Sequence, residues 1–166
     1  MSQSLSMVII HIIFSTKDRF PCLDLVTRQN LHAYLGTVSR NSKCETYRVG
    51  GTADHVHLAV RLCRTVTIAE LVEELKTSSS KWLKMQRPGL HRFSWQRGYG
   101  AFSVNTNELE PLIAYIANQG SITGSEHSRK NIWHYWRNMA FNSTNDISGI
   151  DPMGGLSALF LSSFCP

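Results

Sequence analysis

Residues 55–62 alternate between two kinds of side chain, and this alternation constrains the fold more than any other feature of the sequence. One set is wholly apolar: Val56, Leu58, Val60 and Leu62. The other set begins with two histidines: His55, His57, Ala59 and Arg61. Because successive side chains of a strand point to opposite faces, the segment predicts a strand with one face in a hydrophobic core. The two imidazoles then lie together on the other face.

The remaining segments predict an α+β fold around this strand. Further strands are predicted at residues 7–14, 44–49 and 94–104, from β-branched runs and from the glycines that end or interrupt them. Helices are predicted at 25–39 after an Asp24 cap, at 68–85 after a capping box of Thr67 and Glu70, and near 109 after an Asn107 cap. A final helix is predicted around 129–139. This order indicates an antiparallel sheet with helices packed on it.

Composition narrows the cellular setting and the classes of partner. The formal charge of +5 and the pI of about 9.2 favour a polyanionic partner. No apolar stretch reaches the roughly 18 residues of a membrane helix, and the apolar run near the N-terminus lacks the features of a signal peptide. The four cysteines form no CxxC pair, which argues against a zinc ribbon or a disulfide framework. We therefore expect a cytoplasmic protein without a membrane partner.

The pair formed by His55 and His57 is the sharpest candidate site. Two neutral imidazoles on one face suit a divalent metal, although two ligands alone leave the site incomplete. The alternative is a pair of ordinary strand histidines on a solvated face. Asp54 precedes the pair as either a hydrogen-bond partner of a histidine or the cap of a turn. His11, in an apolar strand, is predicted to be a core histidine with its hydrogen bonds satisfied.

Tyr115 and Gln119 form a second candidate pair on the last of the capped helices. They are four residues apart, so their side chains share one face of that helix. A phenol can attack a phosphodiester, but its usual pKa near 10 requires help from a cation or a base. The glutamine oxygen could complete the coordination of a metal. The alternative, which spacing alone favours, is a packed tyrosine beside an exposed glutamine.

A basic and aromatic interval is the third candidate, because no acidic residue occurs between Glu74 and Glu108. Cations neutralise phosphates and aromatic rings stack on unpaired bases, so this interval predicts contact with nucleic acid. The predicted contact residues are Lys76, Lys81, Lys84, Arg87, Arg92, Trp95 and Arg97. The alternative is a solvated basic helix followed by an aromatic core strand. The sequence has no phosphate-binding glycine loop, HExxH or GxSxG motif, so no nucleotide cofactor is expected.

Four segments in order resemble the single-tyrosine HUH transposases, including the REP-associated tyrosine transposases. Residues 11–17, followed by Arg19 and Pro21, resemble the opening strand of that family. Residues 54–58 contain the histidine–hydrophobic–histidine motif that gives the family its name. Residues 95–104 resemble a further characteristic strand, and residues 115–119 resemble the nucleophile helix. The resemblance spans residues 7–119.

This resemblance implies a ferredoxin-like or RRM-like α+β core and a homodimer that binds hairpins in single-stranded DNA. Tyr115 would be the nucleophile, giving a 5′-phosphotyrosine and a free 3′-OH. His55, His57 and Gln119 would hold Mg²⁺ or Mn²⁺, and in the family the tyrosine helix commonly comes from the partner subunit. No ATP would be needed, because the phosphotyrosine bond conserves the energy for rejoining.

The sequence alone gives an expected domain boundary and leaves two alternative functions open. The expected organisation is one transposase domain at 1–141 and a tail at 142–166. The sequence departs from the family pattern after Gln119, where residues 120–124 intervene before the next charged residues. One alternative is a domesticated enzyme acting on repeat hairpins of the host genome. The other is a non-catalytic RRM-like module that binds nucleic acid.

Overall fold

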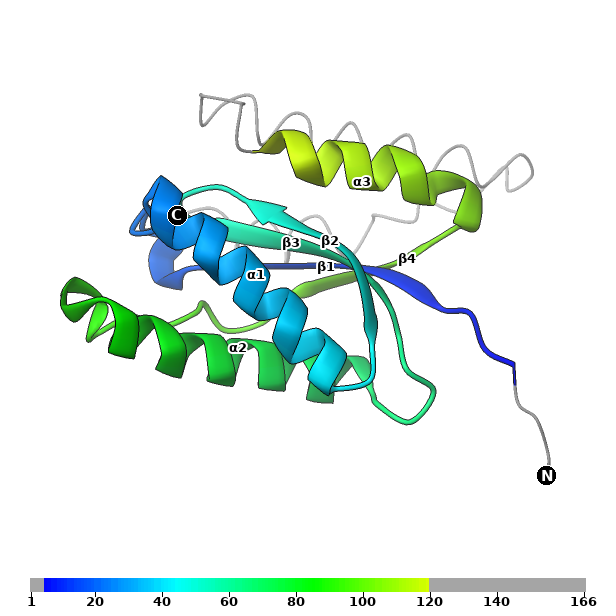
Figure 1. Ribbon diagram of the computed structural model, residues 1–166, viewed down its shortest axis with the longest axis horizontal. Helices are drawn as coiled ribbons and strands as arrows, with labels where there is room; N and C mark the ends of the chain where they lie inside the picture. Colours follow the sequence, from blue (N-terminus) through cyan, green and yellow to red (C-terminus); the bar gives the residue numbers. More distant parts are fainter. Residues whose placement is uncertain (1–4, 120–166) are drawn as a thin grey trace, which may run out of the picture. The chain divides into compact units, whose positions relative to one another are not determined.

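A computed structural model describes residues 5–119, in which four antiparallel strands form one sheet (Figure 1). The strands are β1 (Ile9–Ser15), β2 (Glu45–Gly51), β3 (His55–Arg61) and β4 (Gly100–Val104), in the spatial order β2-β3-β1-β4. The helices are α1 (Leu25–Asn41), α2 (Ile68–Gln86) and α3 (Leu109–Asn118). Short 3-10 turns occupy η1 (Lys17–Arg19), η2 (Pro88–Leu90) and η3 (Thr106–Glu108). The predicted α+β fold with an antiparallel sheet is confirmed.

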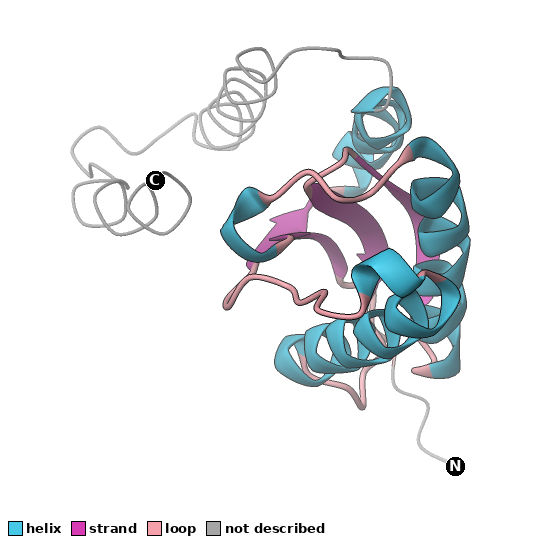
Figure 2. Ribbon diagram, turned by 90° about the vertical axis from the view of Figure 1, so that its left-hand side faces the viewer, coloured by secondary structure: helices cyan, strands magenta, loops and turns pink. Residues whose placement is uncertain are grey.

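The helices lie on opposite sides of the sheet, α1 and α2 on one side and α3 on the other (Figure 2). The core cluster fills the side of α1 and α2, where Val56, Leu58 and Val60 are all 0% exposed. Leu35 of α1 and Leu75 of α2 belong to the same cluster. The alternation along β3 therefore predicted which face of the strand enters this core.

Two of the predicted helix caps are confirmed and the third is wrong. The Asp24 carboxylate accepts from the Thr27 amide at 2.8 Å, and Thr67 and Glu70 form the full capping box of α2. Asn107 does not cap α3: it donates its own amide to the side chain of Asn105 at 3.1 Å. That bond begins η3, so the chain makes one tighter turn before α3 starts.

The fourth strand is shorter than the predicted segment 94–104. Only Gly100–Val104 pairs with β1, while Trp95 makes an isolated bridge with Thr16. Gly98, between them, adopts a φ of +78°, which breaks the extended conformation. The ammonium group of Lys76 donates to the carbonyls of Gln96 and Gly98 and so holds this detour against α2.

Some expectations lie outside the described residues: the helix at 129–139, the intervening segment 120–124, the boundary after 141 and the tail 142–166. Within residues 5–119, no helix is both long enough and apolar enough to cross a membrane.

Candidate active site

His55 and His57 lie on the face of the sheet that α3 covers, and both are buried. Their side chains extend from β3, their residues are 3% and 0% exposed, and their ring centroids are 4.9 Å apart. This burial contradicts the alternative of ordinary histidines on a solvated face. Two imidazoles removed from water need partners for their ring nitrogens, because an unpaired buried polar atom costs free energy.

Asp54 determines which nitrogen of His55 carries the proton. Nδ1 of His55 lies 2.6 Å from Oδ1 of Asp54, and a carboxylate can only accept a hydrogen bond. The proton of the neutral ring is therefore on Nδ1, and Nε2 carries the lone pair. Burial opposes ionisation of Asp54, but hydrogen bonds from His55 and Thr52 and the charge of Arg19 together hold its pKa below the usual range. Of the two sequence interpretations of Asp54, the structure supports the hydrogen-bond partner.

His11 is the corresponding partner of His57. Nε2 of His11 lies 2.9 Å from Nδ1 of His57, and the two rings stack with centroids 5.1 Å apart. Burial lowers the pKa of His11 to about 3, and burial followed by the neighbouring His55 lowers the pKa of His57 well below its usual value. Both rings are thus neutral at neutral pH. The prediction of a buried, hydrogen-bonded His11 is confirmed, and its partner is a site residue.

The outward nitrogens of the pair have no such partner. Nε2 of His55 and Nε2 of His57 are both buried and make no hydrogen bond to any residue of the described part. Imidazole nitrogens without a hydrogen-bond partner suit a divalent metal, because a deprotonated ring nitrogen is a good ligand. Within residues 5–119, no group of three or more His, Cys, Asp and Glu side chains is arranged to hold one. A further protein ligand would have to be of another type, such as an amide oxygen.

Helix α3 brings Tyr115 over the histidines. The Tyr115 ring stands edge-on to His57, with centroids 5.7 Å apart, and lies 6.4 Å from His11. Gln119 follows one turn later and is only 2% exposed, so the alternative of an exposed glutamine is wrong. Leu112 and Ile116 are the buried apolar residues of the same helix. The structure therefore brings the aromatic ring and the histidine pair together within one chain.

Gly50 explains how α3 comes so close to the sheet. It pairs with His57 across β2 and β3, and a Cβ built at Gly50 would lie 2.3 Å from the backbone oxygen of Ile116. Real Cβ atoms do not approach an oxygen so closely, so only glycine permits this contact. The position of Tyr115 thus depends on a residue of another element.

Ser15 is a polar residue of this face that the sequence analysis did not single out. It pairs with His55 across β1 and β3, and its hydroxyl is buried without a hydrogen-bond partner among the described residues. The sequence did contain a signal for it. Ser15 lies four residues after His11, and strand residues at even spacing share a face, so the two residues could have been placed on the same face.

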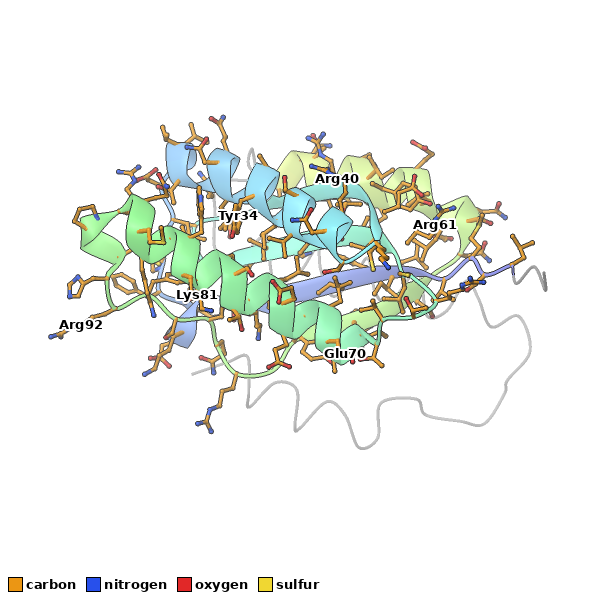
Figure 3. All side chains as sticks on the ribbon, turned by 60° about the horizontal axis from the view of Figure 1, so that its bottom comes forward. Tyr34, Arg40, Arg61, Glu70, Lys81 and Arg92 are labelled. Carbon is orange, nitrogen blue, oxygen red and sulfur yellow. The ribbon has the colours of Figure 1, made fainter. Side chains whose placement is uncertain are left out.

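The predicted nucleic-acid residues divide into two groups. Three are engaged within the protein: Lys76 binds two carbonyls, Arg87 pairs with Asp24 at 2.7 Å, and the Trp95 indole donates to Ser79 at 3.0 Å. The other four are exposed cations: Lys81, Lys84, Arg92 and Arg97. Figure 3 shows Lys81 and Arg92 on the side of the molecule away from Arg61.

Comparisons with known proteins give the chain a family and similar solved structures. The family model described as "Transposase IS200 like" matches residues 4–119. A protein from Deinococcus radiodurans R1, described as a transposase, has a similar solved structure with a TM-score of 0.56 and 21% identity, covering 72% of this chain and 98% of its own. A REP-associated tyrosine transposase bound to a REP hairpin has a TM-score of 0.52 and 18% identity, covering 71% and 72%. No curated protein matches the sequence significantly.

Proposed function

The chain belongs to the family of IS200-like transposases, and from that membership we propose that it cleaves and rejoins single-stranded DNA with Tyr115 as the nucleophile. One observation carries the proposal. Tyr115 stands edge-on to His57 on a buried face where two histidine nitrogens have no hydrogen-bond partner in the described part. A reactive phenol beside two unused metal ligands suits attack on a phosphodiester.

The proposed reaction exchanges one phosphate ester for another. The Tyr115 oxygen attacks the scissile phosphorus and loses its proton, while the bond from phosphorus to the 3′ oxygen breaks. The 3′ oxygen takes up a proton, which leaves a 5′-phosphotyrosine and a free 3′-OH. Attack by a 3′-OH on the phosphotyrosine reverses these steps and releases the phenol. Because the number of ester bonds is unchanged, no ATP is required.

We assign the metal ligands as Nε2 of His55, Nε2 of His57 and the side-chain oxygen of Gln119. Mg²⁺ or Mn²⁺ bound there would supply a Lewis acid for the charge that develops on the phosphate. The role of the protein is to keep the two nitrogens ready. Asp54 holds the His55 proton on Nδ1, and His11 accepts from Nδ1 of His57 when the lone pair of that ring is on Nε2.

The proposed substrate is a hairpin in single-stranded DNA, in line with the REP hairpin in the structure of the similar transposase. Lys81, Lys84, Arg92 and Arg97 are the exposed cations assigned to its phosphates. A homodimer and a transposase domain at 1–141 are part of the same proposal. The alternative of an RRM-like module has less support, because such modules stack bases on an open sheet face. Here α3 packs on that face, beside Gly50.

A cleavage assay with a matched control tests the nucleophile. Wild type, Tyr115→Phe and Tyr34→Phe are incubated with a pool of single-stranded hairpin oligonucleotides and Mn²⁺, and covalent protein–DNA adducts are separated on a denaturing gel. Tyr34 stacks on Trp82 at 4.9 Å in the layer of α1 and α2, so its variant controls for the loss of a phenol. We expect adducts in wild type and Tyr34→Phe, none in Tyr115→Phe, and none with a chelator.

Two results would contradict the proposal. Equal DNA binding without an adduct in any of the proteins would favour the non-catalytic binding module. An adduct that persists in Tyr115→Phe would assign the chemistry to another residue.

A further inference from the structure

Phe20 is a large aromatic residue that the fold leaves in solvent, and we propose that it stacks on a base of single-stranded DNA beside the histidine pair. The residue is 67% exposed, whereas Phe14 and Phe93 are buried and Phe102 is half-buried. The inference rests on the proposed function, and it names a contact with the DNA that neither the motifs nor the active-site geometry assign.

The exposure of Phe20 does not come from a loosely held loop. The amide of Thr16 donates to the carbonyl of Asp54 at 2.8 Å, and the Thr16 hydroxyl donates to the carbonyl of Phe20 itself, also at 2.8 Å. At the other end of the loop, the amide of Leu23 donates to the carbonyl of Ala53 at 3.1 Å. Hydrogen bonds thus fix the backbone on both sides of the ring.

The same loop contains backbone strain. Asp18 and Arg19 have φ values of 56° and 51°, in the left-handed region that residues other than glycine rarely adopt. Consecutive strained residues persist only where the surrounding contacts hold them, and they gather at functional sites. Here the strain accompanies a specific arrangement: the Arg19 side chain reaches Asp54, while the next residue, Phe20, is exposed to solvent.

A short series of contacts connects Phe20 to the histidines. Arg19, its neighbour in the chain, donates Nε to Oδ2 of Asp54 at 3.0 Å. Oδ1 of the same carboxylate binds Nδ1 of His55 at 2.6 Å. A nucleotide stacked on Phe20 would therefore lie next to the residues that orient the proposed metal ligand. We assign it to the single strand that flanks the scissile phosphate.

Cations that suit phosphates lie near this end of the sheet. Helix α2 is acidic in its first two turns, at Glu70, Glu73 and Glu74, and basic towards its end, at Lys81 and Lys84, with Arg87 as its C-cap. Its basic end adjoins the start of α1, where Arg87 pairs with Asp24, four residues after Phe20. Figure 3 shows Arg92 and Glu70 towards opposite ends of the molecule. The basic end of α2 therefore supplies cations that can neutralise phosphates near the loop that carries Phe20.

A binding titration tests the stacking contact separately from catalysis. The full chain carrying Tyr115→Phe is titrated with fluorescently labelled hairpin oligonucleotides that carry a single-stranded flank, in the presence of EDTA, so that neither cleavage nor metal binding contributes. Phe20→Leu keeps an apolar side chain but removes the aromatic face, whereas Phe20→Tyr keeps that face. Leu5→Ala is the control, because Leu5 is 99% exposed and lines a surface depression with Arg61, at the other end of β3 from His55.

We expect Phe20→Leu to bind about tenfold more weakly, from the usual strength of base–aromatic stacking, and Phe20→Tyr to bind as the parent does. Leu5→Ala should bind like the parent. In Phe20→Trp, the added indole emission should be quenched when the oligonucleotide binds.

The possible failures are distinguishable. If the parent binds DNA and Phe20→Leu binds equally well, the stacking contact is refuted while the proposed function stands. If Phe20→Leu keeps DNA binding but loses self-association on a sizing column, the ring serves a protein interface instead. If the parent binds no single-stranded DNA, the proposed function itself fails.

Discussion

The two faces of the first half of β3 are both buried but chemically opposite. On the side of α1 and α2, β3 contributes Val56 and Leu58, both 0% exposed, to a continuous apolar cluster. On the side of α3, the same strand contributes His55 and His57, 3% and 0% exposed, with two ring nitrogens that lack a hydrogen-bond partner in the described part. Burial alone therefore does not separate a structural face from a functional one.

The comparison teaches that two adjacent ring nitrogens without partners mark the site better than burial does. Single atoms without partners also occur in α1, at His32 and Ser39. Packing on the apolar face is complete in the folded chain, because hydrocarbon needs only to be removed from water. On the polar face, two free nitrogen atoms reduce stability until something binds them. We therefore expect perturbations of the polar face to change ligand binding as well as stability. Comparable changes on the apolar side should alter stability alone.

The largest effect is expected from Gly50→Ala. Its Cβ would lie 2.3 Å from the Ile116 backbone oxygen, so α3 must move away from β2. We expect a loss of about 3 kcal/mol in the free energy of unfolding, at the upper end for overpacking, together with loss of the covalent DNA adduct. Urea denaturation and the adduct assay measure the two effects.

Gly36→Ala is the matched control on the apolar side. Gly36 lies within α1, and its Cβ would meet the side chains of Arg40 at 3.5 Å and Val49 at 4.0 Å, which are ordinary contacts. Alanine in a helix is favoured over glycine by up to about 1 kcal/mol. The control should be slightly stabilised and keep adduct formation. A Gly50→Ala protein that behaves in the same way would show that α3 does not depend on this contact.

The next effect is stabilisation by metal, which only the polar face should provide. Mn²⁺ at 100 times its Kd should add about 2.7 kcal/mol to the free energy of unfolding. His55→Ala and His57→Ala should lose this gain, whereas His32→Gln, a histidine substitution in α1, should keep it. Thermal unfolding with Mn²⁺ and with EDTA measures the difference. An equal gain in all three variants would place the metal elsewhere.

The smallest expected effect is a dependence of stability on pH that comes from His32, a residue of α1 on the apolar side of the sheet. Burial, followed by the charges of Arg28 and Arg48, lowers the pKa of His32 from 6.5 to about 4. Below pH 6.5 the unfolded chain binds a proton at this position more readily than the folded chain does, so stability falls as the pH falls towards 4. In His32→Gln the loss between pH 7 and pH 5 should be smaller. Urea denaturation at the two pH values tests this, and an identical loss would contradict it.

The sequence predicted the elements well where short-range rules govern them. The alternation along β3, the Asp24 cap and the Thr67 capping box all depend on neighbours within four residues, and all are confirmed. Local rules failed once, because Asn105 rather than Asn107 is the capping residue that precedes α3. The other failed prediction involves competition over a longer distance. Strand pairing after residue 94 is interrupted where Lys76, from another element, binds the carbonyls of Gln96 and Gly98.

The sequence by itself determined that the two histidines share a face and that Tyr115 and Gln119 share another, because strand and helix periodicity are local properties of the backbone. Only the tertiary structure decided that these faces meet. That meeting depends on a glycine at position 50, on His11 from a different strand and on the burial of both imidazoles. Such contacts join residues far apart in the chain, and they arise from how closely the layers can pack.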